Sequence, residues 1–107
     1  MRKRIYIAGP ITHGDRVHNL AQAQHAFHEL LLGGLAPLAP QLTMLLPFAW
    51  DIPHDVWMLQ CEPWVIIADA VLRLPGYSKG SDEEERIANA VGVPVFYNME
   101  SLREWSK

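Results

Sequence analysis

A run of four acidic residues, which includes Glu84, follows a glycine-bearing loop in the last third of the chain. The apolar residues Ile87, Ala90 and Val91 recur at helical spacing, so we expect a helix from about Ser81 that turns these side chains inward. Glu84 then lies one turn earlier, beside the inward face. A carboxylate at a helix N-terminus should stay ionised and suits nucleophilic attack on the anomeric carbon of a sugar. The spacing of Ser81 and Glu84 also fits a capping box, in which Glu84 does no more than cap the helix.

The loop that precedes this helix carries groups that bind anions. Ser78 supplies a hydroxyl, Lys79 supplies a positive charge, and Gly80 allows a ligand to approach the backbone closely. The N-terminus of the following helix adds unpaired N–H groups and the positive end of a dipole. This combination predicts a site for a phosphate group.

A second glycine loop begins at Gly9, directly after the β-branched and aromatic segment 4–8. That segment predicts a buried strand, and Gly9-Pro10 predicts the turn that ends it. Ligands of open α/β sheets bind outside the carboxyl ends of the strands. Gly9, Pro10 and Ile11 are therefore candidate substrate-binding residues, together with Ser78 to Gly80.

Strand-like and helix-like segments alternate along the whole chain, which is typical of a parallel sheet with helices on both faces. We therefore expect one α/β domain, residues 1–107, with a small flavodoxin-like or Rossmann-like parallel sheet of four to five strands flanked by helices. Pro37 indicates an edge strand or a strand end, and Pro63 should kink or split the second helix. The expected strands are 4–8, 35–38, 69–74 and 93–97, and the expected helices are 18–32, 54–68, 81–91 and 99–105.

The composition argues against several classes of function. The chain has 9 basic and 12 acidic residues, and the basic ones are scattered, so we expect no nucleic-acid polymer as a partner. The single cysteine, Cys61, excludes an internal disulfide and fits a reducing compartment. The apolar runs are too short for a membrane span. We expect a cytoplasmic homodimer or larger homo-oligomer that binds a small molecule, without membrane contact, metal or cofactor.

Taken together, the motifs resemble those of the nucleoside 2-deoxyribosyltransferase-like superfamily. The similarity spans nearly the whole chain and is weakest from Gln41 to Asp55. It is closest to the short bacterial and phage members, and the mammalian 2′-deoxynucleoside 5′-phosphate N-hydrolase is a more distant relative. The segments that carry the resemblance are Tyr6 to Pro10, Asp69 to Gly80, Glu84, Ala88, Gly92 and Pro94-Val95.

The resemblance implies a retaining glycosyl transfer on a nucleoside or its 5′-monophosphate. A glutamate at the position of Glu84 attacks the anomeric carbon, and the base leaves. Water or a second base then resolves the covalent glycosyl-glutamate. Tyr6, Gly9 and Pro10 are implied to line the pocket for the sugar and the base, with Tyr6 as part of the catalytic set.

The resemblance also implies a role for the loop before the acidic run. Ser78 and Gly80 stand where the hydrolase branch holds a 5′-phosphate. The transferase branch has an aspartate at the Ser78 position, which receives the sugar hydroxyl. Serine here favours a monophosphate substrate, although the charges of Asp82 and Glu83 oppose it.

One position departs from the family pattern. Both branches carry a catalytic aspartate eight residues before the strand-leading aspartate, which here is Asp69, and Cys61 occupies that position. A thiol is mostly protonated at neutral pH and cannot do the work of this carboxylate. Glu62 is adjacent but points elsewhere on a regular helix, unless Pro63 re-aims it. Asp69 or Asp55 could substitute, and Asp69 is taken as a candidate catalytic residue. The departure leaves a second hypothesis open, a nucleotide-binding or sensor domain without turnover.

Other side chains have both a structural and a functional explanation. Trp57 and Trp64, with Trp50 nearby, predict either a core or subunit interface, or a wall that stacks on a nucleobase. His13 and His54 either touch a ligand or only support their loops. The first helix carries three histidines that we expect to be exposed rather than bound to a metal, namely His18, His25 and His28.

Overall fold

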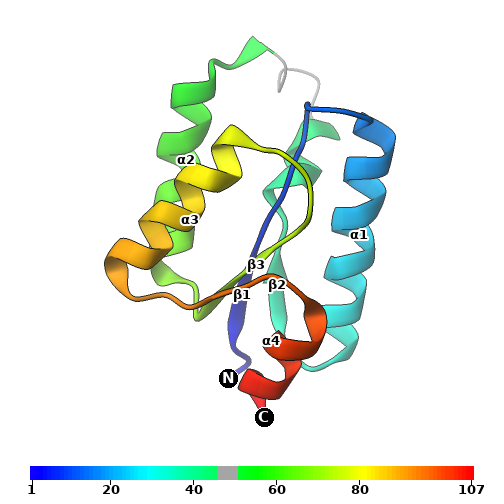
Figure 1. Ribbon diagram of the computed structural model, residues 1–107, viewed down its shortest axis with the longest axis vertical. Coiled ribbons are helices and arrows are strands. Elements are labelled where there is room, and N and C mark those ends of the chain that lie inside the picture. Colours follow the sequence, from blue (N-terminus) through cyan, green and yellow to red (C-terminus); the bar gives the residue numbers. More distant parts are fainter. Residues whose placement is uncertain (46–50) are drawn as a thin grey trace.

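The computed structural model describes residues 1–45 and 51–107, which form one four-stranded parallel sheet between two layers of helices (Figure 1). The strand order is β2-β1-β3-β4, and every neighbouring pair is parallel, so the expected α/β class is confirmed. The strands are β1 (Arg4–Ala8), β2 (Ala36–Leu38), β3 (Ala70–Arg73) and β4 (Val95–Phe96). The helices are α1 (Arg16–Leu32), the 3-10 helix η1 (Pro40–Leu45), α2 (His54–Ile67), α3 (Lys79–Val91) and α4 (Met99–Ser106).

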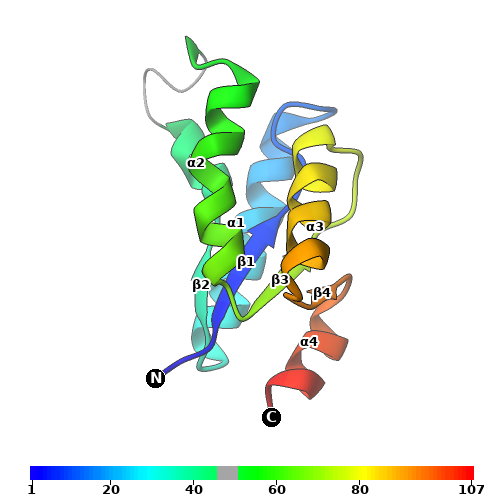
Figure 2. The same ribbon diagram turned by 90° about the vertical axis from the view of Figure 1, so that its left-hand side faces the viewer.

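Alternation along β1 gives each face of the sheet its own core, because successive side chains of a strand point to opposite faces. Ile5 and Ile7 pack on the face covered by α1 and α4, whereas Tyr6 and Ala8 pack on the face covered by α2 and α3 (Figures 1 and 2). Tyr6 is thus a buried residue with a polar group directed toward α2 and α3. The side chains packed on the first face include Leu30, Leu72 and Leu102, and those on the second include Val65, Val71 and Ala88.

The central strand β1 has β2 on one side and β3 on the other. Its register pairs Ala8 with Arg73, so the loops that follow β1 and β3 leave the sheet next to each other. A hydrogen bond of 2.7 Å from the Leu74 N–H to the Ala8 carbonyl extends this pairing into the loops. Open α/β sheets bind ligands at such a point, where neighbouring connections run to opposite sides. The two glycine loops predicted from the sequence therefore meet at the expected edge.

The second helix is not split as one of the two predictions for Pro63 had it. α2 is one continuous α-helix with Pro63 inside it, so of the predicted kink or split the split is wrong. Proline inside a helix costs about 3 kcal/mol, because it removes an N–H and crowds the preceding turn. Packing on α3 and on the sheet, where Val65 is fully buried, offsets this cost.

The edge position that Pro37 predicted for its strand is confirmed, since β2 is an outer strand of the sheet. Proline is tolerated there because an edge strand needs fewer backbone donors. In the part of the chain that the structure describes, no helix combines the length and the apolar character that a membrane span requires.

Candidate functional site

A cavity of about 640 Å³ lies at the carboxyl edge of the sheet, which is within the size range of small-molecule sites. The loops after β1 and β3, η1, and the N-terminal parts of α2 and α3 surround it. The residues that line it are Gly9, Ile11, Thr12, His13, Arg16, Pro40, Gln41, Thr43, Ile52, His54, Trp57, Met58, Cys61, Tyr77, Ser78, Lys79, Gly80, Ser81 and Glu84.

Tyr6, Cys61 and Glu84 form a cluster, here called the Glu84 cluster, to which β1, α2 and α3 contribute one residue each. The Tyr6 hydroxyl donates a hydrogen bond to Glu84 Oε2, and the Cys61 thiol interacts with both side chains. Tyr6 and Glu84 are buried, and Cys61 is partly buried. Glu84 and Cys61 face the cavity, while Tyr6 supports the carboxyl group from the sheet. The cluster therefore fixes one carboxyl group against the cavity.

Burial dominates the electrostatics of the Glu84 cluster. It raises the pKa of Glu84 to about 7, although interactions with Tyr6, Arg73 and Cys61 lower that pKa. Burial also raises the pKa of the Cys61 thiol and that of the Tyr6 hydroxyl, and the charge of Glu84 raises both further. Tyr6 and Cys61 are thus neutral near pH 7, whereas Glu84 gains and loses its proton around this pH. Glu84 is therefore only partly ionised near pH 7, and not fully ionised as expected, because desolvation outweighs the helix N-terminus.

α3 begins earlier than predicted, and this changes the role of Glu84. The N-cap is Ser78, whose hydroxyl accepts a hydrogen bond of 3.1 Å from the Ser81 N–H. The predicted capping box between Ser81 and Glu84 is therefore wrong, and the Glu84 carboxyl group bonds Tyr6 instead. The predicted inward face is corrected as well: α3 buries Ser81, Glu84 and Ala88, whereas Ala90 and Val91 are exposed.

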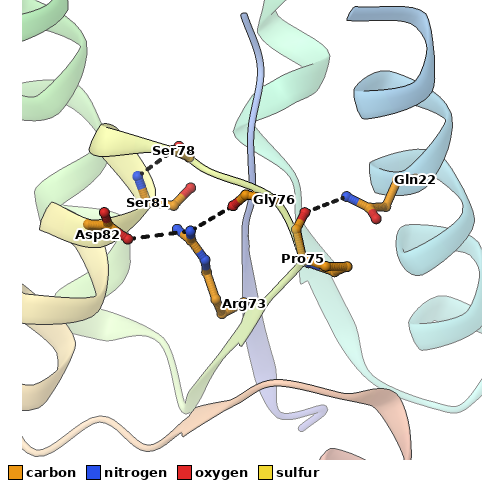
Figure 3. A network of polar contacts seen from close by, with 7 residues as sticks. All are labelled: Gln22, Arg73, Pro75, Gly76, Ser78, Ser81 and Asp82. Carbon is orange, nitrogen blue, oxygen red and sulfur yellow. Dashed lines mark hydrogen bonds and ion pairs between the residues drawn. The ribbon is translucent and has the colours of Figure 1, made fainter. Parts of the chain in front are cut away.

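Side chains from both helical layers fix the loop between β3 and α3 (Figure 3). Arg73 Nη2 donates to the Gly76 carbonyl at 3.0 Å and pairs with Asp82 Oδ1 at 3.3 Å. Gln22 Nε2, from α1, donates to the Pro75 carbonyl at 3.3 Å. The start of α3 is therefore held in place where it faces the cavity.

Pro10 differs from the other predicted binding residues. It is buried and is absent from the cavity wall, so its predicted place there is corrected. A Cβ built on Gly76 would lie only 2.9 Å from Pro10 Cγ, and Gly76 has a φ of +113°. Pro10 therefore packs against the β3–α3 loop and holds the two glycine loops together.

This contact predicts that Gly76→Ala lowers the free energy of unfolding by about 1–3 kcal/mol more than Gly34→Ala, because only Gly76 combines positive φ with a clash. Gly34 has a φ of +84° with nothing within 4 Å of a built Cβ, so it isolates the backbone penalty. Urea denaturation of the two variants measures the difference. Equal losses would contradict a tight contact between Pro10 and Gly76.

The structure brings most of the predicted binding residues together with Glu84. Gly9, Ile11 and the segment 78–80 all line the same cavity. Gly9 has little room for a side chain, because a Cβ there would lie 3.0 Å from Leu74 Cβ. The close approach of the two loops therefore depends on glycine at this position.

Asp69 does not join this group. It precedes β3 at the amino end of the sheet, where Oδ2 accepts a hydrogen bond of 2.7 Å from the Arg4 N–H. Its predicted catalytic position is corrected, because it lies at the opposite end of β3 from the cavity. Glu62 and Asp55 are exposed and are also absent from the wall. Among the described residues that line the cavity, Glu84 is the only carboxylic acid.

Gln41 is a site residue that sequence reasoning missed. Its side chain is buried and lines the cavity, and Oε1 has no hydrogen-bond partner within the described structure. Buried polar atoms are normally paired, so an unpaired acceptor in a cavity wall points to a bound polar molecule. The available signal was one amide side chain at the start of an otherwise apolar segment.

α2 contributes an aromatic ring and two sulfur-containing side chains to the cavity wall. Trp57, Met58 and Cys61 line the cavity from this helix, which agrees with the functional alternative for Trp57. Trp64 does not reach the cavity and is about half exposed beside the edge strand. The expectation for Trp50 concerns a residue outside the described part of the chain.

Two histidines lie at the cavity wall, each with a partner. His54 Nε2 lies 3.5 Å from Glu83 Oε1, and the His13 and Tyr77 rings meet edge to face with centroids 4.9 Å apart. A search of residues 1–45 and 51–107 finds no group of three or more metal-binding side chains. The histidines of α1 are exposed as predicted, namely His18, His25 and His28.

Comparisons with known proteins agree with this architecture. A conserved protein from Enterococcus faecalis V583 superposes with a TM-score of 0.73 at 19% identity, over 89% of this chain and 62% of that one. A 2-deoxyribosyltransferase from Bacillus psychrosaccharolyticus superposes with a TM-score of 0.67 at 18% identity, over 91% of this chain and 78% of that one. No curated protein matches the chain. This chain thus spans less than two thirds of the Enterococcus protein.

The resemblance inferred from the motifs is confirmed at the level of the fold, which is that of the nucleoside 2-deoxyribosyltransferase-like proteins. The family profile described as Domain of unknown function (DUF4406) matches residues 3–97. Since this match covers most of the chain, the protein belongs to the DUF4406 family.

Proposed function

We propose that the protein cleaves or exchanges the N-glycosidic bond of a nucleoside 5′-monophosphate through a covalent intermediate on Glu84. The observation that carries this proposal is the Glu84 cluster: a buried carboxyl group, held by Tyr6, at the wall of a cavity of nucleotide size. The superposition on a 2-deoxyribosyltransferase supports the same reading.

In the first step, a Glu84 oxygen forms a bond to the anomeric carbon as the bond to the base nitrogen breaks. The electron pair of the broken bond stays on the base. Tyr6 and Cys61, both neutral, orient the carboxylate toward the sugar. Water or another base then attacks the anomeric carbon, and the electron pair of the ester bond returns to Glu84. The proton that the attacking molecule loses neutralises the released base. The pKa of about 7 means that near neutral pH a large fraction of Glu84 is ionised and can attack.

The cavity wall at the start of α3 suits a 5′-phosphate. Lys79 and Arg16 line the cavity, and the start of α3 presents backbone N–H groups beside the Ser78 cap. A Cβ on Gly80 would lie 3.3 Å from His54 Cε1, so glycine lets His54 lie close to the start of α3. Gly80 also lies one helical turn before Glu84, a separation that fits the span from the phosphate to the sugar carbon.

Base release from a panel of nucleosides and their 5′-monophosphates, followed by chromatography, tests the proposal. We expect released base, with kcat/KM at least about tenfold higher for monophosphates, because a charge-assisted contact contributes about 1.5–3 kcal/mol. Lys79→Met should lower kcat/KM for monophosphates and leave that for nucleosides nearly unchanged. If a ligand raises the melting temperature but no base appears, the protein binds without turnover and the proposal fails.

A further inference from the structure

In the described part of the cavity wall, the proposed nucleophile Glu84 lies beside a thiol, Cys61, and not beside a second carboxyl group. A neutral nucleobase is a poor leaving group, and enzymes usually protonate it with a positioned acid, which contributes about 10²–10⁴-fold to the rate. The side chain beside Glu84 on α2 is the Cys61 thiol, whose pKa burial raises above its ordinary value. No second carboxylic acid lines the cavity in the described chain, and the sequence of residues 46–50 contains none.

The histidines of the cavity lie away from the Glu84 cluster. His54 precedes Cys61 by seven residues on α2, a separation of about 10 Å along the helix. It contacts Gly80 and pairs with Glu83, so it belongs to the phosphate end. His13 lies in the β1 loop against Tyr77. Neither imidazole contacts a residue of the Glu84 cluster in these interactions.

The wall near Cys61 has the chemistry that attracts a cationic ring. Trp57 precedes Cys61 by one helical turn on α2, and both side chains line the cavity. The face of an indole ring attracts a positive charge by about 0.5–2 kcal/mol. Glu84, as the only carboxylic acid among the described lining residues, adds a negative charge when ionised.

We propose that the preferred substrates are N-glycosides whose base is positively charged, such as an N7-alkylated purine or a pyridinium ribotide; this rests on the proposed function. A Glu84 oxygen bonds to the anomeric carbon, the C–N bond breaks, and its electron pair neutralises the base nitrogen. The base therefore leaves as a neutral molecule without a proton donor. Water then bonds to the anomeric carbon, the ester electron pair returns to Glu84, and one proton passes to solvent.

Matched substrate pairs test this inference. We would compare 7-methylguanosine 5′-monophosphate with guanosine 5′-monophosphate, and nicotinamide mononucleotide with adenosine 5′-monophosphate, in ribose and 2′-deoxyribose forms. Released base is measured against the uncatalysed rate. The expected result is a kcat/KM at least about 100-fold higher for each cationic member, because a neutral base needs a proton that no acid of the described cavity wall supplies, and such an acid contributes at least that much.

Two variants separate the role of position 61 from that of the histidines. Cys61→Asp places a carboxyl group beside Glu84 and should improve cleavage of the neutral members about tenfold or more relative to the cationic ones. Cys61→Ser, which supplies only a neutral hydroxyl, should leave the ratio unchanged. His54→Gln should also leave the ratio unchanged.

Equal cleavage of neutral and cationic members, or a loss of neutral-base cleavage in His54→Gln alone, would overturn the inference and leave the proposed function standing. If none of the compounds is cleaved, the proposed function fails together with the inference. The comparison of cationic and neutral substrates with the wild-type protein tests the inference even if Cys61→Asp does not fold.

Discussion

Glu84→Gln is expected to lower the rate of base release by at least about a thousandfold, because it removes the nucleophile of the proposed reaction. Glutamine preserves the shape of the side chain and can still accept the hydrogen bond from the Tyr6 hydroxyl. The fold should therefore survive the substitution, and binding of a monophosphate should persist. Chromatography of released base measures the rate, and a shift in melting temperature with added nucleotide measures the binding.

Glu62→Gln provides the matched control. Glu62 is an exposed neighbour of Cys61 that does not line the cavity, so the same loss of one carboxylate should leave the rate within about twofold. Comparable losses of the rate of base release in both variants would show that the change in net charge lowers the rate. An unchanged rate in Glu84→Gln would show that Glu84 is not the nucleophile.

The wild-type rate should also depend on pH through this residue. Because attack requires the ionised carboxylate and the pKa of Glu84 is about 7, kcat/KM should rise with pH and level off above about 7. The rise should be close to tenfold per pH unit on the acidic side. A profile that levels off near pH 4.5, the ordinary value for a glutamate, would show that burial does not raise the pKa of the nucleophile.

The second large effect is on stability. Between pH 4.5 and about 7, the free energy of unfolding of the wild-type protein should fall by about 3 kcal/mol relative to that of Glu84→Gln. In this range the folded state holds the Glu84 proton, while the unfolded chain has released it. The stabilisation is therefore complete below pH 4.5 and is lost as the pH rises through 7.

Urea denaturation at several pH values, carried out on both proteins, measures this difference. Other titrating groups are common to both chains and cancel in the comparison. A constant difference across the range would mean that burial does not raise the pKa of Glu84. The stability of the Glu84→Gln variant relative to the wild type is therefore expected to be greater at pH 8 than at pH 4.5, since only the wild type then buries a charge at this position.

The sequence by itself determined the order of the elements and the two loops that build the site. The strand at 4–8, with Gly9 directly after it, needed only the preference of β-branched and aromatic residues for strands and of glycine for turns. The alternation of elements was enough to place both loops at the carboxyl edge of one sheet. Ser78, Lys79 and Gly80 could be assigned to this edge for the same reason.

The start of α3 and the state of Glu84 depended on contacts between distant residues. Local spacing made Glu84 a helix cap, yet its carboxyl group bonds Tyr6, which lies 78 residues earlier in the chain. Desolvation by α2 and the sheet, rather than the helix N-terminus, sets its pKa. No local pattern contains this information, because burial arises only when the layers pack.

The remaining carboxylates show the same division between local pattern and tertiary structure. Asp69 was the preferred substitute for the missing carboxylate along the sequence, with Asp55 and Glu62 as alternatives. The fold places Asp69 at the amino edge of the sheet and the other two at the surface. From the sequence, the resemblance predicted an aspartate at the position that Cys61 occupies. Only the tertiary structure decided that this thiol lies beside Glu84 with no second carboxylic acid in the described cavity, because residues from β1, α2 and α3 meet there through packing alone.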